Sequence, residues 1–177
     1  SKLTHAHELR PNEPYILQRL VLATYKSKEP SELESLMQAR TLLAQLSPAD
    51  SNDPETTGLA GAIQKRLWLV ARDPIQLDKA IEYYNRGFTI RKDYYNGENL
   101  ASCLNLKSEI QTDANQKAFY ESAAKNTRLK LYDLLNALIT SPDFDDRNDK
   151  KWIFATLANV CFHLGKIDDG NQNEALF

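Results

Sequence analysis

Apolar residues recur at helical spacing along almost the whole chain of 177 residues, and this periodicity limits what the chain can fold into. Apolar side chains repeated every three or four residues share one face of a helix, whereas a half-buried strand needs strict alternation of apolar and polar residues. No segment of the sequence has that alternation. The pattern therefore predicts an all-α fold.

Start and stop signals divide the chain into about seven helices, with a short eighth at its end. Pro14 stands at the start of the first helix, and Ser31 with Glu34 forms a capping-box pattern at the start of the second. Asp93 is expected to cap a later helix, and Pro142 follows the end of another. Short polar loops between consecutive helices predict antiparallel pairs.

Small residues in the middle of the chain and near its end follow the spacing of a tetratricopeptide repeat, a pair of helices, A and B, of about 34 residues. Small side chains allow helix A to lie close to helix B. Ala80, Tyr84 and Gly87 fall at helix B spacing, and Gly61 and Ala158 fall at helix A spacing. The sequence therefore predicts a tetratricopeptide-like array of antiparallel hairpins (an α-solenoid), with Gly61 and Ala80 where two helices approach closely.

The repeats are expected to form a single domain over residues 1–177. Its approximate units are 12–47, 54–92, 93–141 and 148–177. Residues 68–77, "WLVARDPIQL", are expected to be an insertion between helices. Because the sequence begins without methionine and ends abruptly with "GNQNEALF", we expect it to be a piece of a larger protein.

The charge balance argues against several classes of partner. Lysine and arginine total 22 against 24 aspartate and glutamate, so the basic excess that phosphate binding requires is missing. No apolar run is long enough to cross a bilayer. We therefore expect no nucleic-acid or membrane partner. Cys103 and Cys161 lie in apolar helical patterns and are expected to be reduced core thiols, which favours a cytoplasmic location.

Two segments carry residue types that could ligate a metal. His5 and His7 are two positions apart and do not share a helix face, so a frayed N-terminal segment is the simpler interpretation. Residues 143–149 are acidic, but Asn148 and Phe154 occupy the positions where a calcium loop needs Gly and Glu. Helix capping is therefore expected for this loop. The sequence predicts no metal site, no cofactor and no catalytic residue.

The basic residues Lys65, Arg66 and Arg72 could contact a phosphate or an acidic peptide. A solvated helix face is the simpler interpretation of such a cluster.

Three stretches resemble one family: "LATYKSKEP", "NDPETTGLAGAIQKRLW" and "AIEYYNRGFTIRKDYYNGENLASCLN", within about residues 10–110. They are similar to the tetratricopeptide-like TRAF-binding region found in stress-activated MAP kinase kinase kinases and in bacterial proteins. The order and loop lengths fit the bacterial members better. The resemblance implies a non-catalytic, protein-binding or regulatory segment beside an effector domain.

The leading hypothesis is a non-catalytic protein–protein interaction or regulatory module of a larger, bacterial signalling or stress-response protein. Stacked hairpins leave helix A side chains along a groove that suits an extended or helical peptide, from a partner or from a neighbouring domain of the same chain. One alternative is a helical domain that positions substrate for an enzyme whose catalytic domain lies outside these residues. Another, a nucleotide or RNA binder, is disfavoured by the charge balance.

The groove is expected to be lined by the helix A positions that point away from helix B. Aromatic rings there would supply buried area, while amides and charges would hold a peptide backbone and its carboxylates. The predicted groove residues are Tyr15, Gln18, Tyr25, Lys26, Glu55, Lys65, Arg66, Tyr95, Glu98, Asn105, Trp152, Asn159 and His163.

Overall fold

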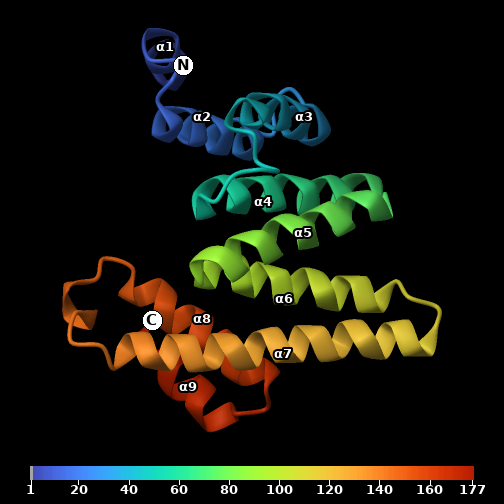
Figure 1. Ribbon diagram of the computed structural model, residues 1–177, viewed down its shortest axis with the longest axis vertical. Helices are drawn as coiled ribbons and strands as arrows, with labels where there is room; N and C mark the ends of the chain where they lie inside the picture. The colour runs from blue at the N-terminus through green and yellow to red at the C-terminus, as the bar shows by residue number, and fades with distance from the viewer. Residues whose placement is uncertain (1) are drawn as a thin grey trace. The chain divides into compact units, whose positions relative to one another are not determined.

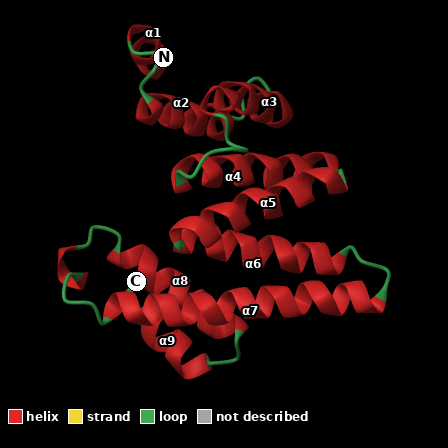
Figure 2. Cartoon of the chain, viewed as in Figure 1, coloured by secondary structure: helices red, strands yellow, loops and turns green. Residues whose placement is uncertain are grey.

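The computed structural model describes residues 2–177, and its regular structure is helical (Figure 1). Figure 2 shows helices joined by short loops, and no strand occurs among the described residues. The prediction of an all-α, tetratricopeptide-like helical array is confirmed. The chain divides into two compact units, Ser1–Arg91 (unit 1) and Lys92–Phe177 (unit 2).

Unit 1 is built from two helix pairs preceded by a short helix. The first pair is α2 with α3, the second is α4 with α5, and α3 also packs against α4. The elements are α1 (Lys2–Leu9), α2 (Pro14–Ser27), α3 (Glu32–Leu43), the 3-10 turn η1 (Ala44–Leu46), α4 (Pro54–Ala71) and α5 (Pro74–Arg91).

Unit 2 repeats the same plan. α6 pairs with α7 and α8 pairs with α9, while α8 also packs against α7 and α6. The elements are α6 (Tyr94–Glu109), α7 (Ala114–Ile139), the 3-10 turn η2 (Phe144–Asp146), α8 (Lys150–His163) and α9 (Ile167–Leu176). In tetratricopeptide order, α2, α4, α6 and α8 are A helices and their partners are B helices.

Side-chain caps begin several of these helices. Ser31 accepts a hydrogen bond from the Glu34 amide at 3.2 Å, and Asp93 accepts one from the Asn96 amide at 2.8 Å. A cap satisfies one of the amides that the first turn of a helix leaves without a partner, and is worth about 1 kcal/mol. Both caps were predicted from the sequence, and both are confirmed.

The core of unit 1 lies between α2, α3 and α4. Leu17 and Val21 of α2 pack with Leu36 of α3 and Ile63 of α4, and each is at most 2% exposed. Full burial of a side chain of this size contributes about 1.5–3 kcal/mol. The apolar stripes that predicted the helices therefore also hold the two pairs together.

Gly61 allows α4 and α5 to approach closely, as predicted. A Cβ atom at Gly61 would lie 2.7 Å from Cε1 of Tyr84, which is shorter than real Cβ contacts. Tyr84 is 1% exposed and Ala80, one turn earlier, is fully buried. The close contact between helix A and helix B of this pair depends on the missing side chain.

Residues 68–77 are not an insertion. α4 continues to Ala71 and α5 begins at Pro74, so only Arg72 and Asp73 separate them. Arg72 adopts φ 57°, and its amide donates to the Trp68 carbonyl at 2.7 Å, which closes the helix. Glycine usually occupies such a left-handed cap position, but here the residue is Arg72. The sequence therefore gave no sign of the turn.

The N-terminal segment is helical rather than frayed. Lys2–Leu9 forms α1, although none of its residues is buried. A helix without a buried face has no apolar stripe, and so its periodicity gave no signal.

Candidate peptide-binding surface

In unit 2, side chains from α6 and α8 meet. Asn159 on α8 donates a hydrogen bond from Nδ2 to Oε1 of Glu98 on α6. Both residues were predicted groove positions, on successive A helices. The bond brings the two helix A faces next to each other, as a continuous peptide-binding surface requires.

A buried arginine lies beneath this pair. Arg128 of α7 is 4% exposed, and the Asn105 amide, oriented with its oxygen toward the guanidinium, accepts bonds of 3.1 Å from both Nη atoms. Nε of Arg128 is buried with no hydrogen-bond partner among the described residues. Burial lowers the pKa of Arg128, and the charge of Glu98 opposes that change. An arginine side chain stays charged in a folded protein even when burial lowers its pKa. Unit 2 therefore holds a partly desolvated cation close to Glu98.

His163, at the end of α8, belongs to the same cluster. Its pKa is lowered below the ordinary value of about 6.5, first by burial and then by the positive charge of Arg128. The imidazole is therefore neutral at pH 7, where it can accept as well as donate a hydrogen bond. Glu98, Asn105 and His163 therefore lie close to Arg128, and Asn159 joins the cluster through its bond to Glu98.

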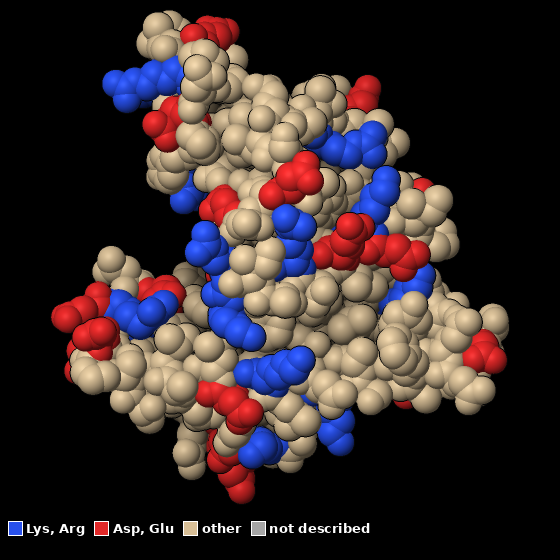
Figure 3. Space-filling view, viewed as in Figure 1, with Lys and Arg blue, Asp and Glu red and all other residues tan. Residues whose placement is uncertain are grey.

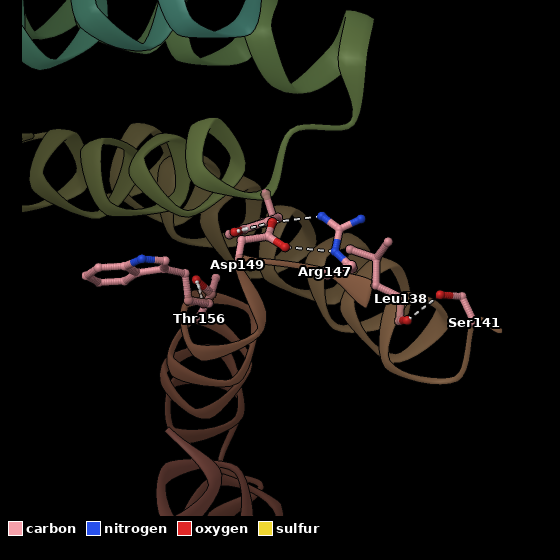
Figure 4. Close-up of polar contacts among 7 residues, drawn as sticks. Leu138, Ser141, Arg147, Asp149 and Thr156 are labelled. Atoms are coloured by element: carbon pink, nitrogen blue, oxygen red, sulfur yellow. Dashed lines mark hydrogen bonds and ion pairs between the residues drawn. The ribbon is translucent and has the colours of Figure 1, made fainter. Parts of the chain in front are cut away.

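Aromatic side chains extend the surface. Trp152 is 64% exposed on α8, seven residues before Asn159 and therefore on the same helix face, and Tyr95 of α6 is 50% exposed. The Trp152 ring lies 6.1 Å from the ring of Phe177. The hydroxyl of Thr156, labelled in Figure 4, donates at 2.7 Å to the carbonyl of Trp152, one turn earlier on α8. Large exposed aromatic residues of this kind serve as anchors at protein interfaces.

The acidic loop before α8 does not cap that helix as predicted. Asp149 stands at the N-cap position without a side-chain cap bond, because its two oxygens accept 2.9 and 2.7 Å bonds from Arg147 (Figure 4). Tyr94 also donates to Asp149, at 2.9 Å. The bond from Arg147 is the main cause that lowers the pKa of Asp149. A two-point bond to a guanidinium is stronger than a bond to a neutral amide, so the ion pair takes the carboxylate.

In unit 1, two predicted groove residues lie in the interior. Gln18 is 8% exposed and donates from Nε2 to Asp53 at 2.7 Å and to Thr56 at 3.0 Å. Tyr25 is 5% exposed, belongs to the core, and carries the Arg66 guanidinium 4.9 Å from its ring centroid. The Gln18 side chain therefore ties α2 to the start of α4, and Tyr25 joins the core of the unit.

The other predicted residues of unit 1 are accessible. Tyr15 is 60% exposed, Lys26 and Glu55 are exposed, and Lys65 and Arg66 are half-buried. Tyr15 and Gln18 line a hollow of about 510 Å³ at the N-terminal ends of α2 and α4. Thus the structure links Glu98 with Asn159 and brings Asn105, Glu98 and His163 close to Arg128 in unit 2, whereas Tyr95 and Trp152 are exposed on the same helices. The predicted residues of unit 1 divide between interior and surface.

A comparison with family models completes the description. The model for Tetratricopeptide Repeats-Sensor matches residues 1–104, which is more than half of the chain. The chain belongs to this family. No curated protein sequence matches the chain, and no solved structure does.

The Tetratricopeptide Repeats-Sensor match includes all of unit 1 and most of α6. Repeats of the tetratricopeptide type are generally non-catalytic and mediate protein–protein interactions through the surfaces of their stacked helices. The helix pairs of residues 105–177 lie beyond the match, yet they continue the same alternation of A and B helices. The tetratricopeptide part of the predicted resemblance is confirmed.

Other features of this Tetratricopeptide Repeats-Sensor chain bear on its chemistry. Cys103 and Cys161 are buried, and within residues 2–177 neither forms a disulfide. Within residues 2–177, no group of three or more His, Cys, Asp or Glu could hold a metal ion. No helix in that range is long and apolar enough to cross a membrane. Figure 3 shows acidic and basic side chains close together on the face drawn.

Arg128 is the site residue that the sequence prediction missed. It lies four residues after Ala124 and three before Leu131, both fully buried, so it occupies the buried stripe of α7. A cation within an apolar stripe is the signal that could have found it, because buried charges are rare unless they are paired.

Proposed function

We propose that the chain is a non-catalytic protein-interaction and regulatory module of a larger bacterial signalling or stress-response protein, as the resemblance to the TRAF-binding region implies. Membership of a family described as a sensor supports a regulatory role. Cys103 and Cys161 are buried and, among the described residues, outside any disulfide, which supports a cytoplasmic location. The units 12–47, 54–92, 93–141 and 148–177 would form one domain of that protein.

The observation that carries the proposal is the hydrogen bond between Asn159 and Glu98. It joins A helices whose accessible side chains include Trp152 and Tyr95, so polar and aromatic groups are available to one ligand. A peptide could bury the Trp152 ring and place a carboxylate or a backbone carbonyl near Arg128. The partner would be a protein or peptide, or a neighbouring domain of the same chain, rather than a nucleic acid or a membrane.

The predicted groove residues of unit 1 would offer a binding surface of their own. Tyr15, Lys26 and Glu55 are accessible in unit 1, and the amphipathic stems of Lys65 and Arg66 are half-buried. Gln18 and Tyr25 would act by holding the helices in place. We propose that affinity comes mainly from unit 2, because aromatic and arginine side chains contribute most at interfaces.

The experiment identifies a partner by pull-down with the full-length protein and then measures its affinity for single variants. Trp152→Ala is expected to weaken binding by about tenfold or more, the loss typical of an anchor residue. Phe119→Ala is the matched control, because Phe119 is 66% exposed at the start of α7 and lies outside the predicted groove. The melting temperatures of both variants should stay near that of the parent.

The opposite result would move the binding surface. If Phe119→Ala weakens binding and Trp152→Ala does not, the partner binds the α7 side of unit 2. An Asn159→Ala variant tests the contribution of the polar cluster independently of the Trp152 ring, since it removes the bond to Glu98 and leaves Trp152 intact.

A further inference from the structure

Unit 1 contains a cavity that is separate from the predicted groove residues. Its volume is about 430 Å³, within the range of about 300–1,000 Å³ typical of small-molecule sites. The walls come from the end of α3, the loop after η1, α4 and α5. The cavity is therefore lined by two B helices, α3 and α5, as well as by the A helix α4.

The apolar part of the cavity comes from side chains that also belong to the core. Leu43 of α3 and Ile63 of α4 are at most 2% exposed and line it, together with Pro48 of the loop. Such a wall excludes water from one side of an occupant, and polar contacts inside the cavity are strengthened as a result.

A buried amide in the cavity lacks a partner. Gln64 of α4 lines the cavity and is 6% exposed, and its Oε1 is buried without a hydrogen bond to any described residue. Buried acceptors are rarely left in this state, because the lost hydration is not replaced. A hydroxyl or amide of an occupant that reaches the Gln64 oxygen would supply the missing hydrogen bond.

Positive charge lies in the same cavity. Arg40 of α3 and Lys79 of α5 line it, and across residues 2–177 neither is paired with a carboxylate. Asp50 is the acidic residue of the lining, so these cations outnumber it and the lining is net positive at pH 7. Lys79 interacts with the charge of Asp73, which lies outside the lining, but neither cation forms an ion pair there, and two such cations at one cavity favour an anionic occupant.

The phenol of Tyr83 adds a hydrogen-bond donor to the cavity lining. Tyr83 of α5 also lines the cavity, and it is half-buried. Burial, followed by the charge of Glu82, raises the pKa of Tyr83. The hydroxyl therefore remains protonated at pH 7 and is available as a neutral donor.

We propose that this cavity binds a small organic anion that also carries a hydroxyl group, with the anionic group near Arg40 and Lys79 and the hydroxyl donating to Oε1 of Gln64. Phosphate esters and hydroxycarboxylates share this chemistry. The occupant would rigidify unit 1, because the cavity joins α3, α4 and α5. The proposal does not depend on peptide binding to unit 2.

The test is a titration of the ¹⁵N-labelled chain, followed by NMR, with glucose 6-phosphate, gluconate, glucose and inorganic phosphate. Glucose 6-phosphate or gluconate should bind saturably and shift the side-chain amide of Gln64. Which of the two binds more tightly tells whether the anion is a phosphate ester or a carboxylate. Glucose lacks the anionic group and inorganic phosphate lacks the alcohol, so each should bind at least about tenfold more weakly.

Two results would overturn the proposal. Failure of both glucose 6-phosphate and gluconate to bind saturably would mean that the cavity holds only water. Inorganic phosphate binding as tightly as glucose 6-phosphate would exclude the contact between the hydroxyl and Gln64.

Variants locate the site. Arg40→Gln and Lys79→Gln should each weaken binding of the better probe by about tenfold, and Gln64→Leu should reduce its affinity to that of inorganic phosphate or glucose. Lys26→Gln is the matched control, since it removes an exposed charge of unit 1 outside the cavity lining. Equal loss in Lys26→Gln and Arg40→Gln would mean that binding responds to overall charge alone. If Gln64→Leu does not fold, the Arg40 and Lys79 variants still decide the question, because both of these side chains lie nearer the surface.

Discussion

Units 1 and 2 each contain a hairpin in which a glycine packs against an aromatic ring, but the helices that carry the glycine and the ring are exchanged. In unit 1 the glycine, Gly61, lies on helix A and the ring of Tyr84 lies on helix B. In unit 2 the ring, Phe162, lies on helix A and Gly170 lies on helix B, where a Cβ atom would lie 2.6 Å from the Phe162 ring. In the α4–α5 and α8–α9 hairpins, close packing therefore places a glycine opposite an aromatic ring, on either helix.

The two contacts differ in their freedom to adjust. Tyr84 is 1% exposed and surrounded by core, whereas Phe162 is half-buried. A ring with a free side can move away from an added methyl group, and a fully enclosed ring cannot do so without displacing its neighbours. The same substitution should therefore cost more in unit 1 than in unit 2.

The largest effect is expected for Gly61→Leu. The new side chain would overlap the enclosed Tyr84 ring, so overpacking should lower the free energy of unfolding by about 1–3 kcal/mol or more. Urea denaturation followed by circular dichroism measures this change. A Gly61→Ala substitution should cost less in a Tyr84→Leu background than in the parent, and equal costs in both would contradict the contact.

Acidification is expected to have a smaller effect on stability. This effect should differ between the loop before α4 in unit 1 and the loop before α8 in unit 2. In unit 1, Arg86 donates to the carbonyl oxygens of Ser51 at 2.8 Å and Asp50 at 3.1 Å, which do not titrate. In unit 2, Arg147 holds the carboxylate of Asp149 instead. Acid should therefore weaken the contact of Arg147 in unit 2 and leave the contacts of Arg86 with these carbonyl oxygens unchanged.

The sign follows from the direction of the shift. The pKa of Asp149 is lower in the folded protein than in the unfolded chain, where it is about 3.9. Its contribution to stability is therefore present above about pH 4 and is lost as the pH falls through the folded pKa. Since the side chain is 34% exposed, solvent limits this contribution to about 0.5–1 kcal/mol.

Asp149→Asn removes the titrating group, so the variant should lose about that much stability at pH 7 and almost none at pH 2. Thermal unfolding at both pH values measures the difference. An equal loss at both pH values would mean that the ion pair with Arg147 is not its source.

Gly170→Ala should have a small net effect on stability. The methyl group meets the Phe162 ring, which can turn toward solvent, and alanine gains about 0.8–1 kcal/mol over glycine within a helix. We expect these contributions to cancel to within about 0.5 kcal/mol. A loss as large as that of Gly61→Leu would show that exposure of the ring does not relieve the contact.

The smallest effect concerns the cluster of unit 2. Replacing Arg128 by methionine removes the positive charge that helps to lower the pKa of His163, so that pKa should rise. NMR titration of the His163 ring in the parent and in the variant measures it. An unchanged pKa of His163 would mean that burial alone lowers it.

Local sequence patterns predicted much of the fold. The caps at Ser31 and Asp93, the apolar stripe around Leu17 and the close approach at Gly61 all depend on residues within a few positions of one another or on one residue type. The end of α4 was missed because Arg72 adopts a left-handed conformation that usually signals glycine. α1 was missed because it buries no residue.

The candidate site was predictable only in part, because its members come from distant segments. Glu98 and Asn159 were named from their helix positions, but the bond between them joins residues 61 positions apart. Arg128 and Asn105 meet only because α6 and α7 pair. No spacing rule links such residues, and their contact depends on how the helices pack.

The sequence by itself determined the helices, their pairing into hairpins and the membership of the tetratricopeptide class, because these follow from periodicity and from short connections. The tertiary structure decided which polar side chains are buried and what they meet. Gln18 and Tyr25 lie inside unit 1, while Gln64 shares a cavity with Arg40 and Lys79. Burial depends on the residues that pack against each helix from elsewhere in the chain, and helical periodicity alone does not specify them.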